Sequence, residues 1–271
     1  MLAALHFLAL SEDVDPWTDP ASTVREHANW IAEFILTRGV QTNEVQRCWA
    51  LLPCFLELAR RAGAQSVDLI ELGPSAGLNL VWDRYRYRYL AGEWGPADSP
   101  LRLAGVERAP VPSEILGTRP AVRRRVGVDL NPIDVGNDDG ARLLKCFVWA
   151  DQSERLHRLD LAIDALRGNP PTLVRGDFVS LLPELLAGRD DDALTIVFET
   201  AALGYVSSEG RAEVLAALDR AGADAPLGFA RTTSPPGGAK GGFGLSIRLW
   251  PGEADAVAYA GFHGAWLDWL A

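Results

Sequence analysis

The chain has 271 residues, of which 48% are hydrophobic, enough to bury one sizeable core, so we expect one α/β domain with helical additions. Its formal net charge of −10 disfavours nucleic acid and anionic membranes as partners. No apolar run approaches the roughly 18 to 20 residues that a membrane span requires, and the apolar residues 1–10 lack the basic flank of a leader, so we expect a soluble, cytoplasmic protein.

The first 65 residues are predicted to form an N-terminal helical cap. Residues 1–10 and 23–38 have helical apolar spacing, and a further helix is expected over 43–61, kinked or divided at Pro53. Cys48, Cys54 and Cys146 have no C-x-x-C spacing, so we expect them to be reduced core residues.

Residues 66–271 are predicted to form a doubly wound, mostly parallel, Rossmann-like sheet of seven strands. Apolar runs alternate with helical patterns, which favours parallel strands joined by crossover helices. The last two runs are joined by a short turn and should pair antiparallel, after a mobile loop over 234–242. The expected strands are 67–72, 126–130, 172–175, 194–199, 227–231, 244–250 and 256–262, and the expected helices are 77–84, 139–167, 180–187 and 208–221.

A Gly-rich turn follows the first of these strands. The pattern Glu71-x-Gly73-Pro74-Ser75-x-Gly77 lets the backbone bend sharply at the end of a strand and come close to a ligand. An acid at position 71 suits a phosphate cradle poorly, and the turn resembles motif I of class I S-adenosylmethionine-dependent methyltransferases. The alternative is a turn whose glycines serve only close helix packing.

The same residues also match the nucleophile elbow G-x-S-x-G, which makes a serine hydrolase the rival hypothesis. Its triad would be Ser75, an acid such as Asp177 or Glu199, and His263. Against it, no HGGG-like oxyanion segment precedes the turn, and Glu71 would put a carboxylate near an oxyanion that needs donors.

Acids close three of the predicted strands, at the edge where open α/β sheets bind ligands. Asp129 is the candidate for the ribose hydroxyls and Asp177 for the adenine amino group, together with the residues that follow them, Leu130 and Phe178. Each acid has an alternative role as a turn or helix cap. Glu199 and the glycine-flanked His263 are candidate general bases, or a paired carboxylate and a structural histidine.

Residues 84–125 form a predicted Arg/Tyr-rich insertion, with nine arginines against four acids, an excess opposite to the global charge. It is either a solvated hairpin with arginine stacked on tyrosine or a lid that captures an anionic substrate. The sequence has no H-E-x-x-H motif and no Cys/His ligand spacing, so no metal site is expected.

Several segments together resemble an uncharacterised bacterial family, a domain of unknown function with a methyltransferase-like fold. They are 41–45, 71–80, 82–87, 147–152, 154–156 and 261–264. The resemblance implies a fold and no reaction. Compared with the family pattern, the chain looks shortened at its start and has Glu199 and Thr200 in place of a His-Ser pair. We expect Asn43, which opens a helix before the first strand, either to cap that helix or to line the cofactor pocket.

The sequence thus predicts an S-adenosylmethionine-binding protein that methylates a small molecule, anionic if the insertion is a lid. A serine hydrolase and a non-catalytic nucleoside-binding module remain as alternatives. The methyl acceptor and the oligomeric state are left open.

Overall fold

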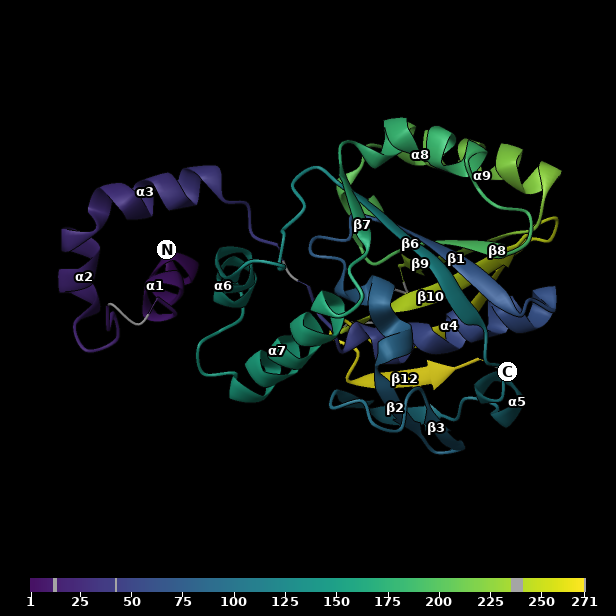
Figure 1. The fold of residues 1–271 in the computed structure, drawn as a ribbon, viewed down its shortest axis with the longest axis horizontal. Helices are drawn as coiled ribbons and strands as arrows, with labels where there is room; N and C mark the ends of the chain where they lie inside the picture. Colours follow the sequence, from purple (N-terminus) through teal and green to yellow (C-terminus); the bar gives the residue numbers. More distant parts are fainter. Residues whose placement is uncertain (12–13, 42, 235–240, 271) are drawn as a thin grey trace. The chain divides into compact units, whose positions relative to one another are not determined.

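The computed structural model describes residues 1–11, 14–41, 43–234 and 241–270, and the chain forms two compact units (Figure 1). The first unit contains residues 1–44 and 133–170, and the second contains residues 45–132 and 171–271. The expected helical region 1–65 is therefore shared between both units. None of the helices in the described ranges is long and apolar enough to cross a membrane.

The first unit is helical, and two helices occupy the range of the single helix predicted over 23–38. At His27 the backbone leaves helical geometry, with φ −107° and ψ 19°. A small apolar core joins the unit and contains Leu5, Phe34 and Cys146. The helices of this unit are α1 (Leu2–Ala9), α2 (Pro20–Glu26), α3 (Ala28–Thr37), α6 (Asp138–Cys146) and α7 (Ser153–Arg167).

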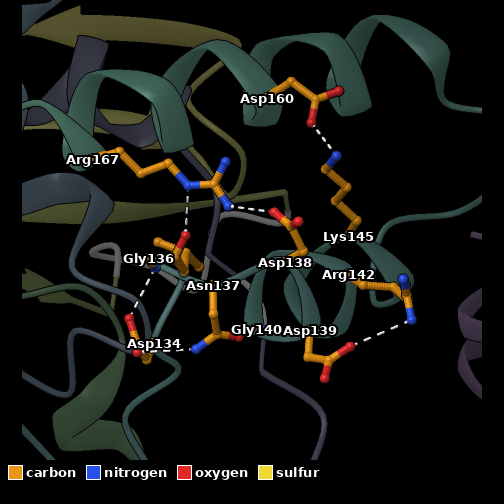
Figure 2. Close-up of polar contacts among 11 residues, drawn as sticks. Asp134, Gly136, Asn137, Asp138, Asp139, Gly140, Arg142, Lys145, Asp160 and Arg167 are labelled. Atoms are coloured by element: carbon orange, nitrogen blue, oxygen red, sulfur yellow. Dashed lines mark hydrogen bonds and ion pairs between the residues drawn. The ribbon is translucent and has the colours of Figure 1, made fainter. Parts of the chain in front are cut away.

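The single helix predicted over 139–167 is wrong, because the chain turns back between α6 and α7. Between the two helices, the Val148 carbonyl accepts a 2.9 Å hydrogen bond from Nδ1 of His6 in α1, and not one from a helical amide. Figure 2 shows how the two helices are fixed: Lys145 pairs with Asp160 across them, and Arg167 at the end of α7 reaches Asp138 at the start of α6, 3.0 Å away.

The second unit contains a mostly parallel sheet of nine strands, in the order β5-β12-β11-β10-β9-β8-β1-β6-β7. From β9 to β7 neighbouring strands are parallel, whereas β10, β11 and β12 each run antiparallel to the strand before them. The strands are β1 (Ser66–Leu72), β5 (Val106–Ala109), β6 (Ala121–Asp129), β7 (Thr172–Arg175), β8 (Leu194–Glu199), β9 (Leu227–Thr233), β10 (Gly242–Leu249), β11 (Ala254–Gly261) and β12 (Trp266–Trp269).

The prediction of seven strands is therefore corrected to nine. The seven predicted runs are strands, and β12 and β5 extend the sheet beyond β11. After β11 the chain turns at 262–265, and β12 pairs antiparallel with β11 and parallel with β5. Arg108 stacks over the Trp266 ring at this added edge, 3.5 Å from its centroid. Residues 235–240 of the predicted mobile loop lie outside the described residues.

Helices cover both faces of this sheet, as a doubly wound fold requires (Figure 1). On one face α8 (Phe178–Ala187) and α9 (Ser208–Asp224) pack on strand residues that include Leu72 and Val197. On the other face lies α4 (Arg47–Ala62), which packs against β8, β9 and β10.

The helix predicted over 43–61 was expected to be kinked or divided at Pro53, and division is wrong, because α4 runs from Arg47 to Ala62 without a break. Proline supplies no N–H to the carbonyl four residues earlier, that of Trp49. The hydroxyl of Tyr89 donates to this carbonyl instead, so the acceptor is satisfied and the helix continues.

The insertion 84–125 carries a second, three-stranded sheet, β3-β2-β4, formed by β2 (Arg86–Tyr89), β3 (Gly92–Trp94) and β4 (Arg102–Ala104), followed by the short helix α5 (Ser113–Leu116). Its alternating tyrosines are buried, whereas Arg88 is exposed. The hydroxyls of Tyr85 and Tyr87 donate to the carbonyls of Leu78 and Trp82, at 2.7 and 2.8 Å. The tyrosines therefore pack inward, and the predicted stacking of arginine on exposed tyrosine is wrong.

Candidate functional site

The Gly-rich turn joins β1 to the 3-10 helix η1 (Leu78–Arg84), where an α-helix was predicted over 77–84. Gly73, Ser75 and Gly77 have positive φ, at 70°, 55° and 81°. The turn lies between the carboxyl ends of β6 and β8, which flank β1. The connections diverge here, so the turn occupies the switch point at which open α/β sheets bind ligands.

The glycines of the turn are also required by packing. A Cβ on Gly73 would lie 2.7 Å from that of Ala202, and one on Gly77 would lie 3.1 Å from Leu173 and Pro171 side-chain atoms. Neighbouring side chains therefore fill the space beside both glycines. The Gly pattern alone does not establish ligand binding.

Glu71 is a buried carboxylic acid beneath this turn, 1% exposed, on the α4 face of the sheet. Asn79 Nδ2 donates to its Oε1 over 3.1 Å, and Cys48 Sγ donates to Asn79 Oδ1 over 3.1 Å. Glu71 Oε2 is buried and has no hydrogen-bond partner among the described residues. Burial raises the pKa of Glu71 to about 8, with a further increase from the Asp129 charge, against the opposing effects of Asn79 and Arg47.

Asp129 lies against the turn at the end of β6. Its Oδ2 accepts a hydrogen bond from the Ser75 amide over 2.8 Å, and its Oδ1 accepts one from the Asn131 amide over 2.9 Å. Each carboxylate oxygen has a second lone pair for a ligand hydroxyl. Leu130 follows with 63% of its surface exposed and offers an apolar wall at the same strand end.

Asp177 caps helix α8. Its Oδ1 accepts a 2.9 Å hydrogen bond from the Val179 amide. The preceding Gly176 amide donates to the Asp129 carbonyl over 2.9 Å, which brings the β7 end beside the β6 end. Phe178 packs into the core under α8 and α9. The adenine contacts of Asp177 and Phe178 remain predictions.

Glu199 is fully buried at the end of β8 and links this strand to Thr232 of β9 and to Leu203 of the following turn. Its Oε1 accepts hydrogen bonds from the Thr232 amide and hydroxyl, at 2.9 and 3.1 Å, and its Oε2 accepts one from the Leu203 amide at 3.2 Å. Burial raises the pKa of this carboxyl. Glu199 pairs in register with Leu72, not with Glu71, so the two acids lie on opposite faces of the sheet.

His263 is exposed in the turn between β11 and β12. This turn docks on the start of α4: Arg47 Nε donates to the Phe262 carbonyl over 2.9 Å, and a Cβ on Gly264 would lie 2.3 Å from the Gln46 carbonyl oxygen. The flanking glycine is thus needed for this close contact. A role of His263 or Glu199 as general base remains a prediction.

Three residues around Glu71 were not assigned to the site from the sequence: Asn79, Arg47, and Cys48, which was expected only as a reduced core residue. Asn79 could have been noticed, because it follows the last glycine of the turn by two residues. Cys48 and Arg47 come from α4, and only the packing of that helix on the sheet brings them to Glu71. Asn43 belongs to the first unit and the turn to the second, so its contribution to cofactor binding remains a prediction.

Comparison with known proteins identifies a family and no activity. The model of a family described as "Uncharacterized protein conserved in bacteria (DUF2332)" matches residues 2–269, nearly the whole chain. No curated protein matches.

Proposed function

This chain belongs to the DUF2332 family of uncharacterized bacterial proteins, and from the residues of its site we propose that it binds S-adenosylmethionine and methylates a small molecule. The observation that carries the proposal is the buried Glu71 Oε2 without a hydrogen-bond partner in the described chain, beneath a Gly-rich turn at the switch point. A buried acceptor of this kind favours a ligand that brings a donor or a positive charge.

The charges of the site support a nucleoside that carries an ammonium group over a dinucleotide. Glu71 and Asp129 are both acids, and they interact closely enough for the Asp129 charge to raise the pKa of Glu71. Asp129, and Glu71 once it is ionised, would repel a pyrophosphate at this turn. The same groups attract an amino group, which favours the ionised form of Glu71, and accept hydrogen bonds from ribose hydroxyls.

Each residue of the site has a specific task in this proposal. Glu71 would hold the amino group of the cofactor and Asp129 the ribose, with Leu130 and Asp177 beside the adenine. When bound, S-adenosylmethionine supplies an electrophilic methyl group. The protein's contribution is then mainly to hold an acceptor in line with that group and to exclude water. The Glu199 carboxylate already accepts three hydrogen bonds, so its position fits a supporting role better than proton transfer.

Isothermal titration calorimetry with S-adenosylmethionine, S-adenosylhomocysteine and NAD tests the proposal. We expect micromolar binding of the first two and none of NAD. The Asp129→Asn variant should bind at least about tenfold more weakly, since a charge-assisted hydrogen bond to ribose is lost.

Asp190→Asn is the matched control, because Asp190 accepts a backbone hydrogen bond two residues ahead, as Asp129 does, but lies before β8 at the opposite end of the strands. The affinity of Asp190→Asn for S-adenosylmethionine should equal that of the wild type. Binding of NAD alone would refute the proposal, as would equal losses of affinity in the two variants.

A serine hydrolase is favoured by one observation, the positive φ of 55° at Ser75, which a nucleophile elbow also requires. This function predicts covalent labelling of Ser75 by a fluorophosphonate, detected by mass spectrometry and abolished in Ser75→Ala. The methyltransferase proposal predicts no adduct.

A further inference from the structure

A hollow lies beside the insertion at the start of β6, whereas the Gly-rich turn lies at the end of that strand. It has a volume of about 370 Å³ and is bounded by the end of η1, the end of β3 and the start of β6. Its walls are formed by Asp83, Arg84, Trp94, Gly95, Pro96, Arg119, Pro120, Ala121 and Val122, all in the second unit. This volume is that of a small-molecule site.

The one acid in the wall is already neutralised. Asp83 Oδ2 accepts a 2.6 Å hydrogen bond from Arg125, and both side chains are largely buried, with exposures of 14% and 11%. Arg84 Nε lies 3.3 Å from the same oxygen. Since Arg125 balances the charge of Asp83, Arg84 adds a net positive charge to the hollow.

Arg119 adds a second positive charge and has no carboxylate partner among the described residues. Its guanidinium lies 5.5 Å from the Trp94 ring centroid, and its Nη1 donates to the carbonyls of Leu116 and Thr118. These contacts hold the group in place without neutralising it. Burial lowers the pKa of Arg119, with no acid to oppose the effect.

The apolar part of the wall is rigid. Trp94 is 5% exposed, its Nε1 donates to the Thr118 carbonyl over 2.9 Å, and its ring packs on that of Trp82 with a centroid separation of 5.3 Å. Pro96 and Pro120 complete this surface. The hollow therefore combines a fixed aromatic wall with two arginines.

We propose that this hollow binds a small organic anion, with a carboxylate or phosphate group on Arg84 and Arg119 and an apolar body against Trp94. The site is separate from the proposed cofactor site: Ala121 and Val122 of the hollow begin β6, whereas Asp129 ends it. Seven residues of extended strand from Val122 to Asp129 span about 23 Å. The anion bound here is thus not the methyl acceptor, and the site is independent of the proposed methyltransferase activity.

Titration calorimetry with benzoate, inorganic phosphate and the uncharged benzamide tests the proposal on the full chain. We expect saturable binding of benzoate or phosphate with a dissociation constant below about 5 mM, whereas benzamide should not bind. Comparison of the two anions shows whether the site takes a carboxylate or a phosphate. Failure of both anions to bind, or equal binding of benzamide, would overturn the proposal.

Two variants and one control locate the binding. Arg119→Gln and Arg84→Gln should each weaken anion binding by about tenfold or more, since each removes a charge-assisted hydrogen bond. Arg88→Gln changes an exposed arginine of the same insertion that does not line the hollow, and it should bind within twofold of the wild type. Unchanged melting temperatures would show that the variants fold. Equal weakening in all three variants would contradict a site in this hollow.

Discussion

At the scale of single residues, the protonation of Glu71 should control cofactor binding. The pKa of this buried acid is about 8 without ligand, and an ammonium group binds best to the ionised form. Well below pH 8 each pH unit lowers the ionised fraction about tenfold, and closer to pH 8 the change is smaller. The affinity for S-adenosylhomocysteine should therefore rise about 25-fold between pH 6 and 7.5. Calorimetric titrations across this range would measure the increase.

Two controls isolate the contribution of the charge. Adenosine lacks the amino-acid portion, so its affinity should stay constant over the same range. Glu71→Gln should bind S-adenosylhomocysteine weakly and with no dependence on pH. An increase of this size that persisted in Glu71→Gln would assign the titration to another group.

Sequence reasoning located single residues at strand ends better than it located their partners. Asp129 was singled out as the acid that closes β6, and the structure places it on the Ser75 amide. Parallel strands fix this position, because their carboxyl ends share one edge of the sheet. The contact between Asn79 and Cys48 depends on how α4 packs on the sheet, and no local pattern encodes that.

At the scale of elements, two substitutions of Asp177 at the start of α8 distinguish a structural role of this residue from a role in cofactor binding. Asp177→Ala removes the hydrogen bond to the Val179 amide and should destabilise the protein by about 1 kcal/mol. Asp177→Asn keeps an oxygen that can cap the helix, so its melting temperature should stay near that of the wild type.

The two variants therefore give different results if Asp177 also binds adenine. A carboxylate that accepts from the adenine amino group would make Asp177→Asn bind S-adenosylmethionine more weakly, although its stability is unchanged. Equal affinity of Asp177→Asn and the wild type would show that Asp177 is only a helix cap.

The element predictions failed where a tertiary contact replaced a local one. Pro53 is a helix breaker by local rules, yet Tyr89 supplies the donor that proline lacks. Residues 139–167 have a helical pattern throughout, yet the Val148 carbonyl is taken by His6 from α1. In both cases the partner is distant in sequence, so periodicity alone could not reveal it.

At the scale of the whole molecule, the alternation of strands and helices predicted a mixed, mostly parallel sheet, and the structure has one. The two strands of this sheet that were missed, β5 and β12, have only four residues each and pair with each other. The first unit joins residues 1–44 to residues 133–170, a segment between β6 and β7. Such a unit depends on long-range contacts, which the sequence alone did not indicate.

The stability of the folded chain should fall with rising pH because of Glu71. An ordinary glutamate loses its proton near pH 4.5, as in the unfolded chain, whereas folded Glu71 keeps it to about pH 8. Between these values the folded state binds more protons, so its stability falls by about 1.4 kcal/mol per pH unit. Because the proton is half lost at pH 8, urea unfolding should show a loss of about 2 kcal/mol between pH 6 and 8.

Glu71→Gln should remove this loss, since glutamine does not titrate. Glu57→Gln is the matched control, because Glu57 is also buried. Burial acts to raise its pKa, but its ion pairs with Arg60 and Arg61 together outweigh burial and lower the pKa, so Glu57 stays ionised from pH 6 to 8. Its variant should be less stable than the wild type at both pH values and should keep the same dependence on pH. If Glu71→Gln lost as much stability between pH 6 and 8 as the wild type, Glu71 would already be ionised at pH 6, and the buried oxygen would need a positive partner within the protein itself.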